Sequence, residues 1–202
     1  MTIRRLVQFL FGGLLILALA AAGLIVGAAI RRRQLVDLQR RHFVSYQLAD
    51  ELRHSSDDLT RLVRLYVVTG DPTYETYYRT VLAIRDGTAP RPEHYERVYW
   101  DLYLATGRPP RNSEPPVALL TLMQNAGYTA EELDSLRTAL ARSTALAAVE
   151  DAAFHALRGE FRDAQGRFTI RGRPDTGLAR RLVFDSAYTY QKARIMAPIE
   201  VT

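Results

Sequence analysis

Aromatic and arginine side chains gather between residues 61 and 103 of this 202-residue sequence. The aromatic members are Tyr66, Tyr74, Tyr77, Tyr78, Tyr95, Tyr99, Trp100 and Tyr103, and the arginines are Arg61, Arg64, Arg79, Arg85, Arg91 and Arg97. Aromatic rings with a few guanidinium groups can line a pocket for a small anionic or aromatic ligand, through bidentate hydrogen bonds and cation–π contacts. The alternative is a helical core whose tyrosines keep their hydroxyl groups at its rim. On the first interpretation, the predicted ligand-binding residues are Arg61, Arg64, Tyr66, Tyr78, Arg85, Tyr95, Tyr99 and Trp100.

The other polar residues form no catalytic or metal-binding pattern. The four histidines (His42, His54, His94 and His155) lack the paired spacing of a metal site, and the absence of cysteine excludes disulfides, thiol catalysis and Cys-based metal sites. Neighbouring acids such as Asp50-Glu51 and Asp57-Asp58 diverge by about 100° around a helix, so we expect them to be solvated faces or helix caps. We therefore expect a protein that is not an enzyme and that holds no cofactor or metal.

The stretch Thr69-Gly70-Asp71-Pro72 interrupts a helical pattern beside the first tyrosines. With one glycine and no lysine it is no phosphate-binding loop. Gly70 suits the left-handed position after a helix end, Asp71 suits an N-cap, and Pro72 suits a first helical position. We predict that one helix stops here and another starts.

The remaining helix start and stop signals predict an all-α fold. A stripe of apolar and small residues at alternating spacings of three and four indicates a long helix over 34–69. Thr129 and Glu132 form a capping box that opens a helix to about Arg158. The other predicted helices cover 72–85, 92–105, about 116–126, 175–184 and 186 onward, with a loop or small hairpin at 159–175. Three long segments then form a four-helix-bundle-like domain with short accessory helices.

The residues from Leu6 to Ile30 are apolar except for Gln8. As a helix, this run spans roughly 37 Å, enough to cross a bilayer core of about 30 Å. A cleaved signal peptide is the alternative, but a signal core of about 7–15 residues is shorter than this run. We predict an uncleaved anchor over residues 1–33. Gly23 and Gly27 either let two such helices approach closely or reflect the general frequency of glycine in membrane helices.

Positive charge is concentrated at the N-terminal end of the chain. Residues 1–41 hold seven arginines and one aspartate, for a net charge of +6, whereas residues 42–202 hold 20 basic and 21 acidic side chains, for −1. A nearly neutral domain is a poor nucleic-acid binder, so we expect no nucleic-acid partner. Arginines on both sides of the apolar run leave the topology ambiguous, with a mild preference for a cytoplasmic domain.

Three stretches carry a family resemblance: "LADELRHSSDDLTRLVRLYVVTGDPTYETYY", "RPEHYERVYWDL" and "FTIRGRPDTGLARRLVFDSAYTYQKARIMAPI". Together they resemble the extracytoplasmic sensor region of some bacterial methyl-accepting chemotaxis proteins, hybrid histidine kinases and membrane-bound nucleotide cyclases. The resemblance covers roughly residues 43–200. It implies a helical, ligand-sensing, homodimeric domain in the periplasm, held in the inner membrane between two membrane helices. It overrides the charge-based topology, because long domains translocate largely regardless of flanking charge.

The expected function is therefore that of a receptor input domain for chemotaxis, two-component or cyclase signalling, over residues 34–202. Such receptors continue to a second membrane helix and an output module, and this sequence stops at Thr202, so we expect a fragment or a truncated product. The alternative is a single-pass anchored scaffold that binds other proteins. The resemblance carries over no ligand-binding residues, so the predicted site depends on the aromatic and arginine residues alone.

Overall fold

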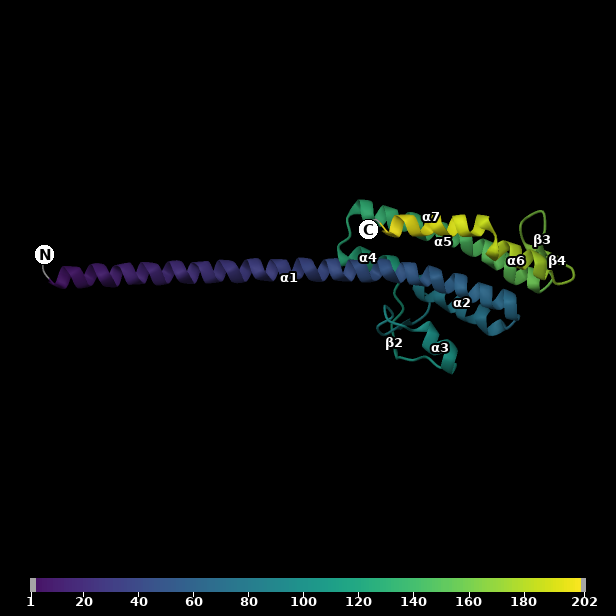
Figure 1. Ribbon diagram of the computed structural model, residues 1–202, viewed down its shortest axis with the longest axis horizontal. Helices are drawn as coiled ribbons and strands as arrows, with labels where there is room; N and C mark the ends of the chain where they lie inside the picture. Colours follow the sequence, from purple (N-terminus) through teal and green to yellow (C-terminus); the bar gives the residue numbers. More distant parts are fainter. Residues whose placement is uncertain (1–2, 201–202) are drawn as a thin grey trace. The chain divides into compact units, whose positions relative to one another are not determined.

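The computed structural model describes residues 3–200, without the side chains of residues 4–11, 14–16, 18, 37–38 and 41 (Figure 1). Within this range the helices are α1 (Ile3–Thr69), α2 (Pro72–Arg85), α3 (Trp100–Thr106), α4 (Leu119–Ala126), α5 (Ala130–Leu157), α6 (Thr176–Phe184) and α7 (Ser186–Glu200). Two short antiparallel hairpins pair β1 (Arg91–Pro92) with β2 (Ser113–Glu114) and β3 (Glu160–Arg162) with β4 (Phe168–Arg171). The all-α class is confirmed.

The chain divides into two compact units between Phe43 and Val44. In the first unit, large apolar side chains of α1 are exposed; they are Leu17, Leu19, Leu24, Ile25, Val26, Ile30, Leu35, Val36 and Phe43. Among the residues that the structure describes, no helix has the length and hydropathy of a membrane span. The span predicted from Leu6 to Ile30 falls partly on residues whose side chains lie outside this description.

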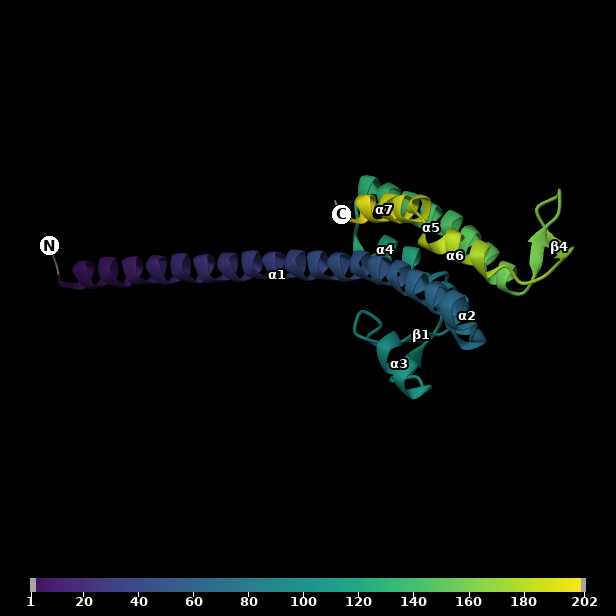
Figure 2. The ribbon, with the colours of Figure 1, turned by 45° about the vertical axis from the view of Figure 1, so that its right-hand side comes forward.

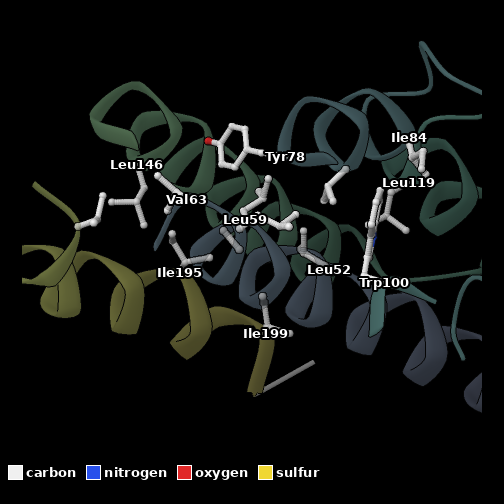
Figure 3. Packing of buried hydrophobic residues seen from close by; sticks show 14 of the residues in the cluster. Leu52, Leu59, Val63, Tyr78, Ile84, Trp100, Leu119, Leu146, Ile195 and Ile199 are labelled. Atoms are coloured by element: carbon white, nitrogen blue, oxygen red, sulfur yellow. The ribbon is translucent and has the colours of Figure 1, made fainter. Parts of the chain in front are cut away.

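The second unit is a helical bundle. Helices α5, α6 and α7 lie together on one side of the last part of α1, and α3 with the β1–β2 hairpin lies on the other side (Figures 1 and 2). Side chains from α1, α2, α5 and α7 meet in one hydrophobic core (Figure 3). Its members include Leu52, Leu59, Val63, Tyr78, Ile84, Trp100, Leu119, Leu146, Ile195 and Ile199, all at most 7% exposed. The core ties the segments on both sides to α1.

The predicted stop and restart after α1 is confirmed. Gly70 has φ +72°, which suits a residue without a Cβ atom. The Asp71 carboxylate accepts a hydrogen bond from the Thr73 backbone N–H at 2.9 Å, and Pro72 is the first residue of α2. The predicted capping box at the start of α5 is also present, between Thr129 and Glu132.

The helix predicted over 92–105 is wrong in its first half, because α3 begins only at Trp100. Pro92 pairs with Ser113 across the β1–β2 hairpin, and the Glu93 N–H donates to the Asn112 carbonyl at 2.9 Å. His94 has φ +52°, which turns the chain out of the helical path. The backbone of this segment is therefore bonded to a distant strand rather than to itself.

A close backbone contact fixes the point where the chain leaves α2 for this hairpin. Gly87 has φ +72°, and a Cβ atom there would lie 2.3 Å from the Ala118 backbone nitrogen. This close approach of the Gly87 and Ala118 backbones fixes the position of β1, and of the segment after it, relative to α1.

Candidate functional site

A cavity lies between one face of α1 and the segment 95–101 that leads into α3. Glu51, His54, Ser55 and Asp58 supply the helical wall, because residues three, four and seven apart share one helix face. The volume of the cavity is about 200 Å³. We call it the aromatic–acidic cavity, after the three rings and the carboxylates that line it.

Glu51 is the most buried acid of the cavity, at 4% exposure. Both of its carboxylate oxygens accept hydrogen bonds from Arg91 in β1, one of them at 2.6 Å. Burial raises the pKa of Glu51, and the Arg91 guanidinium opposes this shift. The Glu51–Arg91 pair therefore fastens the hairpin to α1 beside the cavity.

Asp58 occupies the next position of the same helix face, two turns further along α1. Its Oδ1 accepts a hydrogen bond from Arg61 at 2.8 Å, and the same guanidinium also bonds Asp101 of α3. Burial raises the pKa of Asp58 to about 6; Arg61 opposes the shift and Asp101 adds to it. Asp58 thus keeps a carboxylate whose charge is incompletely compensated.

Three rings form the opposite wall. The Trp100 Nε1–H donates to the Tyr95 hydroxyl at 2.8 Å, and the Tyr99 ring lies edge-on to both, with centroids 5.4 Å from Tyr95 and 5.2 Å from Trp100. Tyr103 stacks on Trp100 at 5.5 Å with an interplanar angle of 6°. Burial raises the pKa of Tyr95, so its hydroxyl is protonated at neutral pH. The wall is therefore aromatic and carries no charge at neutral pH.

The structure brings together only part of the predicted ligand-binding set. Tyr95, Tyr99 and Trp100 line the cavity, and Arg61 bonds two of its carboxylates. The remaining four residues (Arg64, Tyr66, Tyr78 and Arg85) lie in the helical bundle.

These four residues have interior partners. Arg64 donates to the Val183 carbonyl at 2.9 Å, and Arg85 donates to the Ser143 hydroxyl at 2.8 Å. Tyr66 packs edge-on against Phe154 at 4.8 Å. For these positions the bundle-core interpretation of the sequence fits, because each side chain contacts a residue of the bundle and lies outside the aromatic–acidic cavity.

Tyr78 belongs to a polar cluster around Glu150, which is 2% exposed. The carboxylate of Glu150 accepts a hydrogen bond from the Tyr78 hydroxyl at 2.6 Å and another from the Tyr188 hydroxyl. Burial raises the pKa of Glu150 and also of both tyrosines. The cluster joins α2, α5 and α7 and is closed to a ligand.

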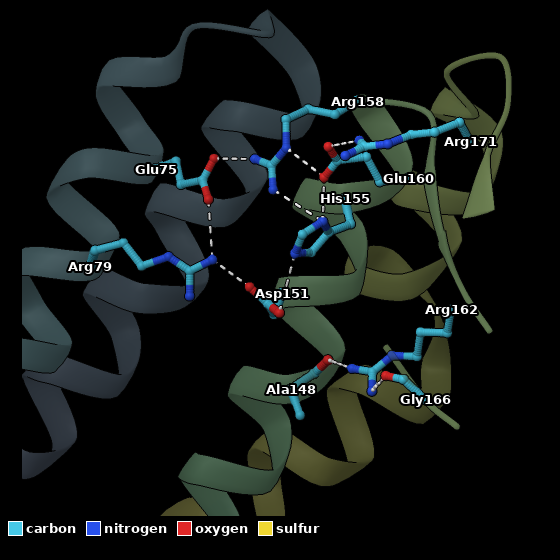
Figure 4. Close-up of polar contacts among 10 residues, drawn as sticks. All are labelled: Glu75, Arg79, Ala148, Asp151, His155, Arg158, Glu160, Arg162, Gly166 and Arg171. Carbon is cyan, nitrogen blue, oxygen red and sulfur yellow. Dashed lines mark hydrogen bonds and ion pairs between the residues drawn. The ribbon is translucent and has the colours of Figure 1, made fainter. Parts of the chain in front are cut away.

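A second polar network fixes the β3–β4 hairpin to α2 and α5 (Figure 4). Arg158 bonds Glu75 and Glu160, and His155 lies between Asp151 at 3.6 Å and Glu160 at 2.5 Å. Both ring nitrogens of His155 therefore face carboxylates, and Nδ1 is hydrogen-bonded to Glu160. We assign this network a structural role.

The serine and the histidine of the cavity each have a partner on α1. The Ser55 hydroxyl donates to the Leu52 carbonyl at 2.9 Å, and His54 Nδ1 lies 3.1 Å from Asp50. The serine and histidine therefore face different partners and form no nucleophile–base pair. In the described part of the chain, no group of three His, Asp or Glu residues could hold a metal ion.

The sequence-based prediction missed the carboxylates of the cavity. It placed Glu51 and Asp58 on solvated faces, whereas Glu51 is buried and Asp58 is largely enclosed. Their spacing of seven along the helix, with Ser55 between them and leucines at the next positions, was the available signal. This spacing puts both acids next to the apolar stripe, at the edge of the buried face of the helix.

Comparison with known proteins identifies no relative. No protein-family model matches the chain, and neither the curated proteins nor the solved structures contain a significant match.

Proposed function

We propose that the chain is the ligand-sensing input domain of a bacterial membrane receptor, anchored in the inner membrane and facing the periplasm. The observation that carries this proposal is the placement of the aromatic–acidic cavity on α1. The same helix, continuous from Ile3 to Thr69, also carries the apolar run from Leu6 to Ile30. A ligand in the cavity would act directly on the helix that we propose as the anchor.

The apolar side chains of the first unit support the anchor. Single exposed apolar residues are ordinary on a protein surface, but a continuous apolar run of this length needs lipid or another helix around it. We propose residues 1–33 as the anchor, residues 34–202 as the sensor domain, and a homodimer as the working form. The periplasmic location follows from the family resemblance of residues 43–200.

The contacts of α7 suggest how a ligand would produce a signal. The Tyr188 hydroxyl lies 2.9 Å from Thr60 Oγ1, and Lys192 Nζ donates to Ser56 Oγ at 2.7 Å. These bonds hold α7 to the turns of α1 that also supply Ser55 and Asp58 to the cavity. A ligand that draws the segment 95–101 towards α1 would bias the position of α7 relative to α1, and such small helix shifts transmit signals in other proteins.

A binding experiment distinguishes this function from that of an anchored scaffold. Trp100 is the single tryptophan of the chain and lines the cavity, so its fluorescence is sensitive to a ligand bound there. We expect at least one compound of a metabolite library to shift both the Trp100 emission and the unfolding temperature in a saturable way. A library without any such compound would support the scaffold.

The location is tested separately by reporter fusions. Alkaline phosphatase fused after residue 200 should be active, because it folds in the periplasm, and β-galactosidase at the same position should be inactive. The reverse pattern would place the domain in the cytoplasm and refute the proposed location.

A further inference from the structure

We propose that the aromatic–acidic cavity binds a small organic cation, an ammonium group that carries a few carbon atoms. This inference rests on the proposed sensing function and names the ligand class of the same site. It replaces the anionic or aromatic ligand that the arginine content of the sequence suggested.

The charges around the cavity are mainly negative. Carboxylates of Glu51, Asp58, Glu96 and Asp101 line it, and Arg97 is the guanidinium in its lining, with a side chain that is 65% exposed. Arg91 and Arg61 lie nearby, but each is bonded to the carboxylates. Four carboxylates thus face three guanidinium groups, two of which are already bonded to the acids, and this excess of negative charge disfavours an anion where water is excluded.

The ion pairs with arginine leave some carboxylate oxygens of the cavity residues able to accept further hydrogen bonds. Arg61 occupies only Oδ1 of Asp58, and Oδ2 receives no hydrogen bond from the described residues. Glu96 is held loosely, since its Oε1 lies 3.4 Å from His94 Nδ1 and 3.7 Å from Arg97 Nε. The N–H groups of a primary ammonium would supply the donors that these oxygens lack, whereas a quaternary ammonium would supply the positive charge alone.

The aromatic rings of the cavity provide a second attraction for a cation, besides the carboxylates. Tyrosine and tryptophan rings attract cations through their negative faces, and this attraction is strongest where water is excluded. Tyr99 and Trp100 are 7% and 2% exposed, so the packing of the fold already places both rings at the cavity. A volume of about 200 Å³ limits the ligand to a small molecule, such as a short alkyl ammonium ion.

The test compares probes that differ in charge but not in shape. The full chain, purified in a non-ionic detergent, is titrated with choline and with 3,3-dimethylbutan-1-ol, in which carbon replaces the charged nitrogen. Ethanolamine adds a primary ammonium, and benzoate adds an aromatic anion. We expect choline or ethanolamine to change the Trp100 fluorescence saturably and to raise the unfolding temperature, whereas the neutral alcohol and benzoate do neither.

Two variants locate the bound cation. Asp58→Asn keeps the shape and the hydrogen bond to Arg61 but removes the charge, and we expect it to bind the ammonium probe about tenfold more weakly. Asp134→Asn removes one exposed carboxylate from α5, outside the cavity, and should leave the affinity unchanged. If Asp58→Asn lacks the wild-type helical circular dichroism spectrum, Glu96→Gln serves as the second cavity variant.

The outcomes separate the ligand class from the sensing function. Binding of the alcohol or of benzoate as tight as that of the ammonium probes would overturn the cation proposal. An ammonium affinity that is equal in wild type and in the cavity variant would overturn it as well. If neither ammonium probe binds but another metabolite changes the Trp100 signal, the cation class fails and the sensor stands. If no compound at all changes it, both fail.

Discussion

At the scale of single residues, the enclosed carboxylates of Glu150 and Asp58 differ in their partners. Glu150 accepts hydrogen bonds from two buried tyrosines, so its oxygens are satisfied within the bundle. Asp58 is bonded to one arginine, which it shares with Asp101. The first arrangement holds helices together, whereas the second leaves a charge that a ligand can complement.

The raised pKa of Asp58 predicts a specific dependence of stability on pH. Its folded pKa of about 6 exceeds the ordinary value of 3.8. Between these values the folded state binds the proton more tightly than the unfolded state, so this residue adds stability as pH falls from 7 to 4. At pH 7 Asp58→Asn should be more stable than wild type by roughly 1–2 kcal/mol.

Urea unfolding at several pH values measures this difference. The advantage of Asp58→Asn should shrink as pH falls below 6, and Asp134→Asn serves as the control because that aspartate is exposed. An advantage that stays constant from pH 7 to pH 4 would contradict the assigned titration.

The hydrogen bonds of Glu150 predict a contrast between two substitutions. Glu150→Ala removes the acceptor of the buried Tyr78 hydroxyl and leaves the Tyr188 hydroxyl with Thr60 Oγ1 alone, and should cost about 2–4 kcal/mol of unfolding free energy. Glu150→Gln keeps the shape and one acceptor oxygen, and its amide N–H can donate to the other tyrosine hydroxyl, so it should cost less than about 1 kcal/mol. Guanidinium unfolding followed by circular dichroism measures both, and equal losses would contradict the prediction by showing that an amide cannot replace the carboxylate between the two hydroxyls.

At the scale of elements, local signals in the sequence predicted most helix boundaries. Gly70, Asp71 and Pro72 act within one turn of their own position, so their effect can be read without knowing the fold. The capping box at Thr129 is equally local. The start of α3 was predicted wrongly because Pro92 pairs with Ser113 in a β-strand. The sequence around Pro92 contains no signal for a pairing partner 21 residues away.

The candidate site was predictable only in part, for the same physical reason. Tyr95, Tyr99 and Trp100 are close in sequence, and the aromatic crowding identified them together. The acids that face them lie on α1, and Arg91 and Glu51 are 40 residues apart. Only the tertiary fold shows which arginines are already paired, and this pairing reverses the expected charge of the ligand.

The crossing at Gly87 predicts how the hairpin is held against α1. Gly87→Ala would force a Cβ atom to 2.3 Å from the Ala118 nitrogen at a positive φ, and should cost at least about 2 kcal/mol. Gly107→Ala has a similar φ of +67° but nothing within 4 Å, so it should cost about 1 kcal/mol.

Thermal unfolding compares the two alanine variants. Because Gly87 leads into the strand that carries Arg91, Gly87→Ala should also reduce the change in Trp100 fluorescence that a bound probe causes. Equal destabilisation by both substitutions would show that the backbone at Ala118 moves aside easily.

At the scale of the whole molecule, the exposed apolar residues of α1 in the first unit predict a helix–helix contact between two copies of the chain. Leu35 and His42 lie within about 20° of one another around α1, and Arg40 lies about 140° from Leu35.

The chain has no cysteine, so a single introduced cysteine is its only thiol. In membranes treated with a mild oxidant, Leu35→Cys and His42→Cys should form disulfide-linked dimers, and Arg40→Cys should form few. Cross-linking of equal extent at all three positions would indicate random collision and would refute a dimer that is organised along this face of α1.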